Sequence, residues 1–339
     1  MKIFEVGGAV RDSLLNKKAK DKDWVVVGSS PEEMIAKGFK PIGKDFPVFL
    51  HPKTNEAYAL ARTERKTGKG YHGFNFYYGK EVTLEEDLSR RDLTINAMAR
   101  DNNGNIIDPF NGLDDIKNKI FRHVSNAFSE DPLRAIRLAR FHTYEHLQDF
   151  KIDSKTIKLI EAIVDSGEIA NLSADRVWAE TELAIKSKIP NKFFEIILDL
   201  NLKEPFFKSL EDSKCDSSSN NVIRWAELQA NNNFLLEKTL LVPNIYKNGS
   251  KIFEMLLKID GDMNPKELVK IVPTINFDRN EALVKGLTAL PQLTETTNLI
   301  LNLLNNMKET DFSFLKDIPN NEINEEKLKI YSDIINKSL

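Results

Sequence analysis

Asp21-Lys22-Asp23-Trp24-Val25-Val26-Val27 is the stretch of this 339-residue sequence that decides its fold. Residues 23–27 are aromatic and β-branched, which predicts a strand. Side chains two apart on a strand point to the same side, so we expect the carboxylates of Asp21 and Asp23 to converge. A divalent cation relieves their repulsion, and Mg²⁺ prefers one or two carboxylates together with phosphate oxygens. For this pattern alone, a solvated turn of charged residues is the competing interpretation.

A glycine turn lies just upstream, in Gly7-Gly8-Ala9-Val10-Arg11-Asp12. Residues 3–6 predict a strand and residues 9–15 a short helix, so Gly7-Gly8 joins the two. Glycines at such a turn let backbone amides approach a phosphate, and an arginine in the first helical turn can pair with one. Gly8 and Arg11 are therefore candidate nucleotide-binding residues. The turn is neither a dinucleotide loop nor a Walker loop, and a simple tight turn remains the alternative.

A third motif is Arg90-Arg91-Asp92-Leu93-Thr94-Ile95-Asn96-Ala97. We expect Asp92 to cap a following helix and Asn96 to lie one turn further on, near the same face. With Arg91 on a phosphate, these residues would form a ribose and phosphate clamp. The alternative is a helix cap with a basic flank.

The fourth motif is Glu130-Asp131-Pro132-Leu133-Arg134-Ala135-Ile136-Arg137-Leu138-Ala139-Arg140. Proline suits the start of a helix. Asp131, Arg134, Arg137 and Arg140 are spaced by three, so they form one slowly drifting stripe on a helix whose other face is apolar. The stripe predicts a cationic surface for a nucleotide, with a solvated basic face as the alternative.

The rest of the chain predicts two kinds of structure. Residues up to 112 mix strand and helix signals, with further strands over 46–51 and 56–62 and a helix over 31–37. From Asp114 onward, apolar residues recur at three and four, which predicts an almost wholly helical remainder. The polar segment 213–221 predicts a loop or linker.

The composition limits the class of protein. The chain is 41% hydrophobic and 29% charged with a net charge of −3, as in soluble globular proteins, so nucleic-acid binding would need a local basic face. The one cysteine, Cys215, excludes an internal disulfide and a cysteine-based metal cluster and suits a reducing compartment. We find neither a signal peptide nor an apolar run of about 20 residues, so we expect a cytoplasmic protein away from the membrane.

In this order, the four motifs resemble those of the bacterial CCA-adding enzymes, the class II tRNA nucleotidyltransferases, and of the related poly(A) polymerases. The resemblance extends to about residue 185 and includes residues 46–51, 59–66, 108–112 and 175–178. It implies an α+β fold, in which an N-terminal nucleotidyltransferase palm with a small mixed sheet precedes an all-α neck, body and tail. The expected division is a catalytic head over 1–112, a base-recognition neck over 113–200 and a tRNA-binding body and tail over 201–339.

The resemblance also implies roles for residues. Asp21 and Asp23 would be the catalytic carboxylates that hold Mg²⁺. The nucleotide contacts of the family fall on Gly8, Arg11, Arg91, Arg137 and Arg140. The pair that reads the incoming base falls on Asp131 and Arg134. A carboxylate accepts from the exocyclic amine of cytosine or adenine, whereas guanine and uracil present a carbonyl there and would leave acceptors unpaired.

Two further features complete the expectation. Glu64 is the candidate for a third catalytic carboxylate, and residues 66–71 resemble a flexible loop that helps relatives switch from C to A addition. Many relatives carry a C-terminal His-Asp phosphohydrolase domain, but here no histidine follows His146, so we expect no such metal site in residues 200–339.

The expected activity is template-independent addition of C, C and A to the tRNA 3′ end from CTP and ATP, with two metal ions and release of pyrophosphate. An enzyme adding only CC or only A, or a poly(A) polymerase, is the alternative within the class. Outside it, the alternative is an RNA-binding module on a decayed transferase fold.

Overall fold

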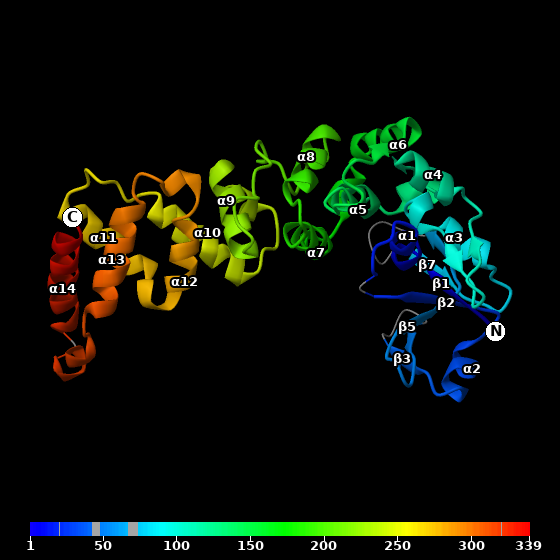
Figure 1. Ribbon diagram of the computed structural model, residues 1–339, viewed down its shortest axis with the longest axis horizontal. Coiled ribbons are helices and arrows are strands. Elements are labelled where there is room, and N and C mark those ends of the chain that lie inside the picture. Colours follow the sequence, from blue (N-terminus) through cyan, green and yellow to red (C-terminus); the bar gives the residue numbers. More distant parts are fainter. Residues whose placement is uncertain (20, 43–47, 67–73, 320) are drawn as a thin grey trace. The chain divides into compact units, whose positions relative to one another are not determined.

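The computed structural model describes residues 1–19, 21–42, 48–66, 74–319 and 321–339 (Figure 1). The chain forms two compact units, one of Met1–Thr181 with Glu195–Phe206 and one of Glu182–Phe194 with Phe207–Leu339. Within the described ranges, we find no helix with the length and apolar character needed to cross a bilayer.

A mixed sheet lies at the centre of the first unit, with seven strands in the order β3-β4-β5-β2-β1-β8-β9. Strand β2 pairs antiparallel with β1 and parallel with β5. The predicted strands around residues 3–6, 23–27, 46–51 and 56–62 are confirmed within the described residues. The strand bounds are β1 Lys2–Val6, β2 Asp23–Val27, β3 Lys40–Ile42, β4 Val48–Leu50, β5 Ala57–Leu60, β8 Ala99–Arg100 and β9 Ile106–Ile107.

Both faces of this sheet are apolar, because successive side chains of a strand point to opposite sides. Val26 belongs to one cluster, which includes Met34 of helix α2 (Pro31–Ala36). Val25 belongs to the other, which includes Leu88 of helix α3 (Leu84–Ser89) and Ala97. Asp23 has the parity of Val25, so the strand directs its side chain toward the face that α3 covers.

The first unit also contains helices and short strands outside this sheet. Residues predicted as short helices near Ala9 and Pro31 form α1 and α2. The unit is not wholly helical after Asp114, because β10 (Ile120–Phe121) pairs in parallel with β11 (Lys151–Ile152). The remaining elements are α1 Gly8–Leu14, β6 Thr63–Lys66, β7 Phe74–Tyr77, η2 Thr94–Asn96, α4 Gly112–Asn118, η3 Asn126–Glu130, α5 Leu133–Phe141, α6 Ser154–Asp165, η4 Glu168–Asn171, and α7 Ala174–Ile185 and α8 Asn191–Asp199, which both include residues of the second unit.

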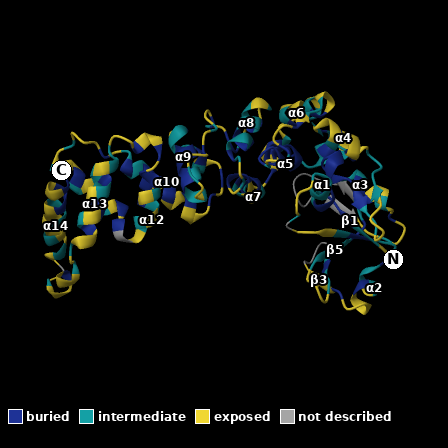
Figure 2. Cartoon of the chain, viewed as in Figure 1, coloured by how far each residue is buried: buried dark blue, intermediate teal, exposed yellow. Residues whose placement is uncertain are grey.

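In the described residues of the second unit, all regular secondary structure is helical. Many of its apolar side chains gather in a buried cluster that includes Phe253, Phe277 and Leu303, and buried residues are seen in dark blue on these helices in Figure 2. Segment 213–220 carries no helix, as predicted, and Cys215 within it is buried. The elements are α9 Asn221–Asn231, η5 Leu236–Lys238, α10 Asn244–Leu256, α11 Pro265–Ile275, α12 Phe277–Leu287, η6 Pro291–Leu293, α13 Thr297–Glu309, η7 Ser313–Asp317 and α14 Ile323–Ser338. The predicted α+β class, a palm-like mixed sheet followed by helices, is confirmed.

Candidate active site

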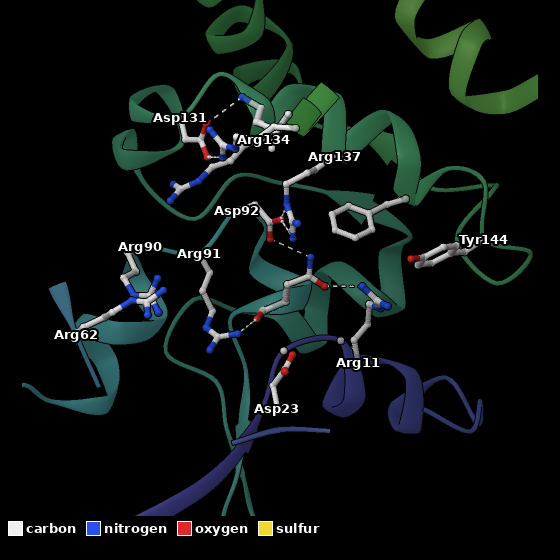
Figure 3. Close-up of a pocket in the computed structure, with 16 residues that line it drawn as sticks. Arg11, Asp23, Arg62, Arg90, Arg91, Asp92, Asp131, Arg134, Arg137 and Tyr144 are labelled. Atoms are coloured by element: carbon white, nitrogen blue, oxygen red, sulfur yellow. Dashed lines mark hydrogen bonds and ion pairs between the residues drawn. The ribbon is translucent and has the colours of Figure 1, made fainter. Parts of the chain in front are cut away.

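A polar cleft of about 540 Å³ opens in the first unit, between the glycine turn and helix α5 (Figure 3). Most of the residues singled out in the sequence meet there, although the four motifs are far apart along the chain. The lining residues are Gly7, Gly8, Arg11, Asp23, Arg62, Arg90, Arg91, Asp92, Asn96, Asp131, Leu133, Arg134, Arg137, Phe141, Tyr144 and Arg176. Asp21 and Arg140 are not among them.

The glycine turn and β2 form the floor of the cleft. The register of β1 and β2 places Val6 opposite Asp23, so Asp23 lies beside the turn that begins at Gly7. Gly7 has φ 75° and ψ −137°, a conformation that side-chain-bearing residues rarely adopt. A Cβ there would lie 2.9 Å from Nη1 of Arg91. The glycine therefore lets Arg91 approach the backbone next to Asp23.

Asp92 is the centre of a buried network. Its Oδ1 accepts hydrogen bonds from the amide of Leu93 (2.9 Å) and from Nδ2 of Asn96 (3.0 Å), while Nε of Arg137 donates to Oδ2 (2.9 Å). Nη1 of Arg11 donates to Oδ1 of Asn96 (2.6 Å), so the network connects two sides of the cleft. Burial alone would raise the pKa of Asp92, but the Arg137 charge and the Asn96 hydrogen bond outweigh it and hold that pKa well below its usual range.

The expected helix cap at Asp92 is not what the structure shows. The residues that follow form only the 3₁₀ turn η2, whose N-cap residue is Leu93. The carboxylate of Asp92 instead binds a single amide and turns toward Arg137 and Asn96. Asn96 is directed to the same carboxylate, so the expectation that the two residues share a face is confirmed.

Helix α5 carries the arginine stripe, but its members do different things. Arg137 reaches the cleft, where it bridges Asp92 and Oε1 of Glu180 (3.4 Å). Arg140 is buried, and its Nε donates to Glu180 while its Nη1 donates to the hydroxyl of Tyr144. Its guanidinium also lies 4.6 Å from the ring centroid of Phe141. Arg140 therefore supports the wall behind the cleft and does not line it.

Arg11 is fixed from the opposite side. Its Nε donates to Oδ1 of Asp12 (2.8 Å), and Nε2 of His146 lies 3.0 Å from the same oxygen. Burial would raise the pKa of Asp12, but the hydrogen bond with His146 and the charge of Arg11 lower it overall. The guanidinium of Arg11 also lies 5.8 Å from the ring centroid of Tyr144. These contacts hold Arg11 with its Nη1 toward Asn96 and the cleft.

The proposed base-reading pair lies at the other end of the cleft. Asp131 precedes α5 in an extended conformation, and its Oδ2 accepts from Nη2 of Arg176 (2.7 Å). Its Oδ1 accepts from the amide of Leu133 (3.2 Å). Nη1 of Arg134 donates to the carbonyl of Ala127 (2.7 Å). Both side chains are thus oriented by neighbours before any ligand is present.

A second buried carboxylate, Asp87 of α3, holds the arginines on the remaining side. Its Oδ1 accepts from the backbone amide of Arg62 (3.2 Å) and from Nη2 of Arg90 (2.9 Å), and its Oδ2 accepts from Nη2 of Arg91 (3.3 Å). The Asp87 side chain is fully buried. Burial would raise its pKa, but the charges of Arg90 and Arg91 outweigh this and lower it.

The residues at the cleft floor fit a magnesium ion that arrives with a phosphate. Asp21 and Asp23 are both exposed, and Asp23 faces the cleft at the start of β2. Among the described residues, no group of three or more acidic, histidine or cysteine side chains converges on one point. Mg²⁺ needs only one or two carboxylates when phosphate oxygens and water complete its shell. The side chain of Glu64 and residues 67–73 lie outside what the structure describes.

Sequence reasoning missed several residues of this site. Arg62, Arg90 and Arg176 line the cleft, and Asp87 and Glu180 orient its arginines. Arg90 lies within the third motif and Arg176 within a segment of the resemblance, so both could have been identified as candidates from the sequence. Asp87 and Glu180 gave none, because their partners are recognised only from the three-dimensional contacts.

Two family models match this chain, one before helix α5 and one after it. The profile described as "Poly A polymerase head domain" matches residues 3–122. The profile described as "Probable RNA and SrmB- binding site of polymerase A" matches residues 149–214. Together the two matches cover more than half of the chain.

Solved structures share the fold across nearly the whole chain. The Bacillus stearothermophilus CCA-adding enzyme in complex with CTP is 22% identical with a TM-score of 0.71, over 98% of this chain and 88% of that one. The Thermotoga maritima CCA-adding enzyme complexed with tRNA is 22% identical with a TM-score of 0.64, over 99% and 90%. A tRNA nucleotidyltransferase complexed with a primer tRNA and an ATP analogue is 21% identical with a TM-score of 0.52, over 99% and 93%. The two family matches show that the chain belongs to the poly(A) polymerase family, and the likeness to the solved structures shows that it shares their fold.

Proposed function

We propose that this protein adds C, C and A to the 3′ end of tRNA, without a nucleic-acid template, using CTP and ATP. The observation that carries the proposal is the convergence of four separated motifs on one cleft, in which Asp23 faces a wall of arginines. Structures similar to this one bind CTP, tRNA, or a primer tRNA with an ATP analogue. Membership of the family supports nucleotidyl transfer, and the ligands of these similar structures support CTP, ATP and tRNA as its substrates.

In the proposed reaction, the 3′-hydroxyl of the RNA attacks the α-phosphate of the incoming nucleotide in line. A new P–O bond forms as the bond to the β-phosphate breaks, pyrophosphate leaves, and the hydroxyl proton passes to solvent. Asp21 and Asp23 would hold Mg²⁺, which supplies charge neutralisation to the triphosphate and acidity to the attacking hydroxyl when it is bound.

The arginines and Asn96 supply the nucleotide site. Arg11, Arg91 and Arg137 are positioned by Asn96 and Asp92, so their donors are oriented before the nucleotide enters. Preorganised donors of this kind stabilise transferring phosphoryl groups without reorganisation during the reaction. Gly8 lines the same side and leaves room for the phosphates.

Asp131 and Arg134 would select the base. Asp131 retains acceptor capacity beside Arg176, and Arg134 carries further donors beyond the one it gives to Ala127. An amino group on cytosine or adenine satisfies the carboxylate, whereas the carbonyl of uracil or guanine would face it acceptor to acceptor. An unsatisfied buried polar group costs about 1–3 kcal/mol.

We assign the proposed roles to three successive parts of the chain. Residues 1–112 would supply catalysis and residues 113–200 base recognition. The helices of residues 201–339 would bind tRNA.

One experiment separates the proposal from its alternatives. The protein is incubated with Mg²⁺, a tRNA transcript lacking its last three nucleotides, and CTP, ATP or both. Addition of three nucleotides supports the proposal, two or one would show a partial enzyme, and a long A tail would show a poly(A) polymerase. No incorporation, including on a CC-ended transcript, would refute every catalytic assignment and leave RNA binding as the function.

A further inference from the structure

Two buried carboxylates each orient a group of the arginines that line the cleft. Asp92 holds Arg137 and, through Asn96, Arg11. Asp87 holds the side chain of Arg90 and the backbone of Arg62. Figure 3 shows Arg62 and Arg90 at one side of the cleft and Arg11 at the opposite side. The proposed nucleotide contacts account for the Asp92 group but give Arg62 and Arg90 no role.

Arg91 connects the two groups. One guanidinium nitrogen donates to Oδ2 of Asp87 (3.3 Å), and the other donates to the carbonyl of Asn96 (3.5 Å). Arg91 also lies against Gly7, beside Asp23, where the triphosphate would enter. Arg62 and Arg90 lie beyond it, so they are placed to meet a second anion that approaches the same reaction centre.

The number of arginines in the cleft suits two anionic reactants. Seven arginines and three aspartates line the cleft, and three further acids, Asp12, Asp87 and Glu180, pair with some of these arginines from behind. A nucleoside triphosphate enters with divalent metal ions that neutralise much of its charge, so it does not by itself require every arginine of the cleft. The other reactant in the proposed transfer is an RNA, and arginine is well suited to its phosphates because the planar guanidinium binds two oxygens at once.

We propose that Arg62 and Arg90 bind the phosphodiester backbone of the RNA primer close to its 3′ end, and that Asp87 is their positioning residue. The inference rests on the proposed function, because it takes the cleft as the place where RNA and nucleotide meet. The carboxylate of Asp87 fixes the main chain at Arg62 and the guanidinium at Arg90 through the same oxygen, Oδ1. A single buried anchor thus sets the spacing of the two arginines, which come from distant parts of the sequence.

The test measures RNA binding without catalysis. The probe is a fluorescein-labelled tRNA transcript that lacks its last three nucleotides, titrated with the full chain in the absence of nucleotide between 50 and 200 mM salt. Arg62→Ala and Arg90→Ala should each weaken binding about tenfold at low salt, since each removes a charged hydrogen bond. Each should also reduce the slope of log K against log salt by about 0.7 to 0.9, as for one lost phosphate contact.

Two measurements make this result specific. Lys117→Ala removes the same charge from an exposed position of the same unit outside the cleft, so it should leave the RNA affinity and the salt slope at wild-type values. Calorimetric titration with CTP and Mg²⁺ should give unchanged nucleotide affinity for both arginine variants. If CTP binding weakens about tenfold while RNA binding stays at the wild-type level, the two arginines serve the triphosphate and the inference is wrong.

The positioning role has its own readout. Asp87→Asn should weaken RNA binding in the wild-type background. The same substitution should reduce the RNA affinity much less in the Arg90→Ala background, because both residues act through one contact with the RNA. An equal loss of RNA affinity in both backgrounds would assign Asp87 a purely structural role. If Asp87→Asn does not fold, the arginine variants alone decide whether this side of the cleft binds RNA. Because no turnover is required, a protein that binds RNA in this way yet adds no nucleotide would refute only the proposed function.

Discussion

Gly7→Ala tests whether the glycine turn serves the cleft or only the chain reversal. Gly7 has φ 75° and ψ −137°, and an alanine forced into such a conformation costs about 1–3 kcal/mol. The new Cβ would also lie 2.9 Å from Nη1 of Arg91, closer than such atoms approach in folded proteins. That nitrogen is the end of a long side chain, so we expect Arg91 to move while the fold is kept.

The displacement predicts a defined loss of nucleotide binding. If Arg91 donates to a phosphate of the incoming nucleotide, losing that charged hydrogen bond costs about 1.5–3 kcal/mol. With a tenfold change for each 1.4 kcal/mol, the Kd for CTP should rise roughly ten- to a hundredfold. Calorimetric titration of the folded variant with CTP and Mg²⁺ measures this, and thermal denaturation measures the strain separately.

Gly104→Ala is the matched control. Gly104 also has a positive φ, 87°, but no atom lies within 4 Å of the position of its Cβ, and it does not line the cleft. It should therefore lose stability while keeping the CTP affinity of the wild type. If Gly7→Ala and Gly104→Ala are destabilised alike and both bind CTP with wild-type affinity, the position of Arg91 does not affect nucleotide binding. The proposed role of the glycine turn in the cleft would then be wrong.

Three other predictions concern the carboxylates. Asp21→Ala should abolish incorporation of labelled CTP into the tRNA transcript at an unchanged melting temperature, and retained activity would contradict the metal assignment. Asp131→Ala should raise incorporation of UTP and GTP relative to CTP, and unchanged rejection of both would count against base reading. Burial would raise the pKa of Asp92, but Arg137 lowers it below its ordinary value near 4. The ion pair should therefore contribute its full stability at a pH above the pKa of the unfolded state. That contribution should be lost as the pH falls through the lower pKa of the folded state. The difference in melting temperature between wild type and Asp92→Asn should therefore narrow below about pH 4, and a constant difference from pH 7 to 3 would exclude this linkage.

The sequence predicted the parts of the fold that depend on local patterns. The strand over residues 23–27 and the helix that begins at Pro31 follow from β-branched content and from a serine cap, and both form as expected. The short pairing of β10 with β11 was missed, because each strand has two residues and no pattern of alternation can be recognised over that length.

The arginine stripe illustrates what spacing alone does not decide. Spacing by three correctly predicted that Arg134, Arg137 and Arg140 belong to one helix, α5. Which of them faces the cleft depends on an acid from another helix, since Glu180 of α7 holds the buried Arg140 and contacts Arg137. Such pairing is set by how the two helices pack, so it cannot be predicted from the local sequence of α5.

The sequence alone also did not decide which acidic residue in or behind the cleft can hold a metal. Asp23, Asp87 and Asp92 all stand in or near the sequence motifs, and residue type alone would allow any of them to hold a metal. The structure separates them by exposure and by partners: Asp23 is exposed at the cleft floor, while Asp87 and Asp92 are buried and already accept hydrogen bonds from arginines. A carboxylate whose charge is matched inside the protein has little attraction left for a cation. The exposed one remains free to meet a metal and a phosphate, so the two buried aspartates are better understood as the supports that keep the arginines in place for the reaction at Asp23.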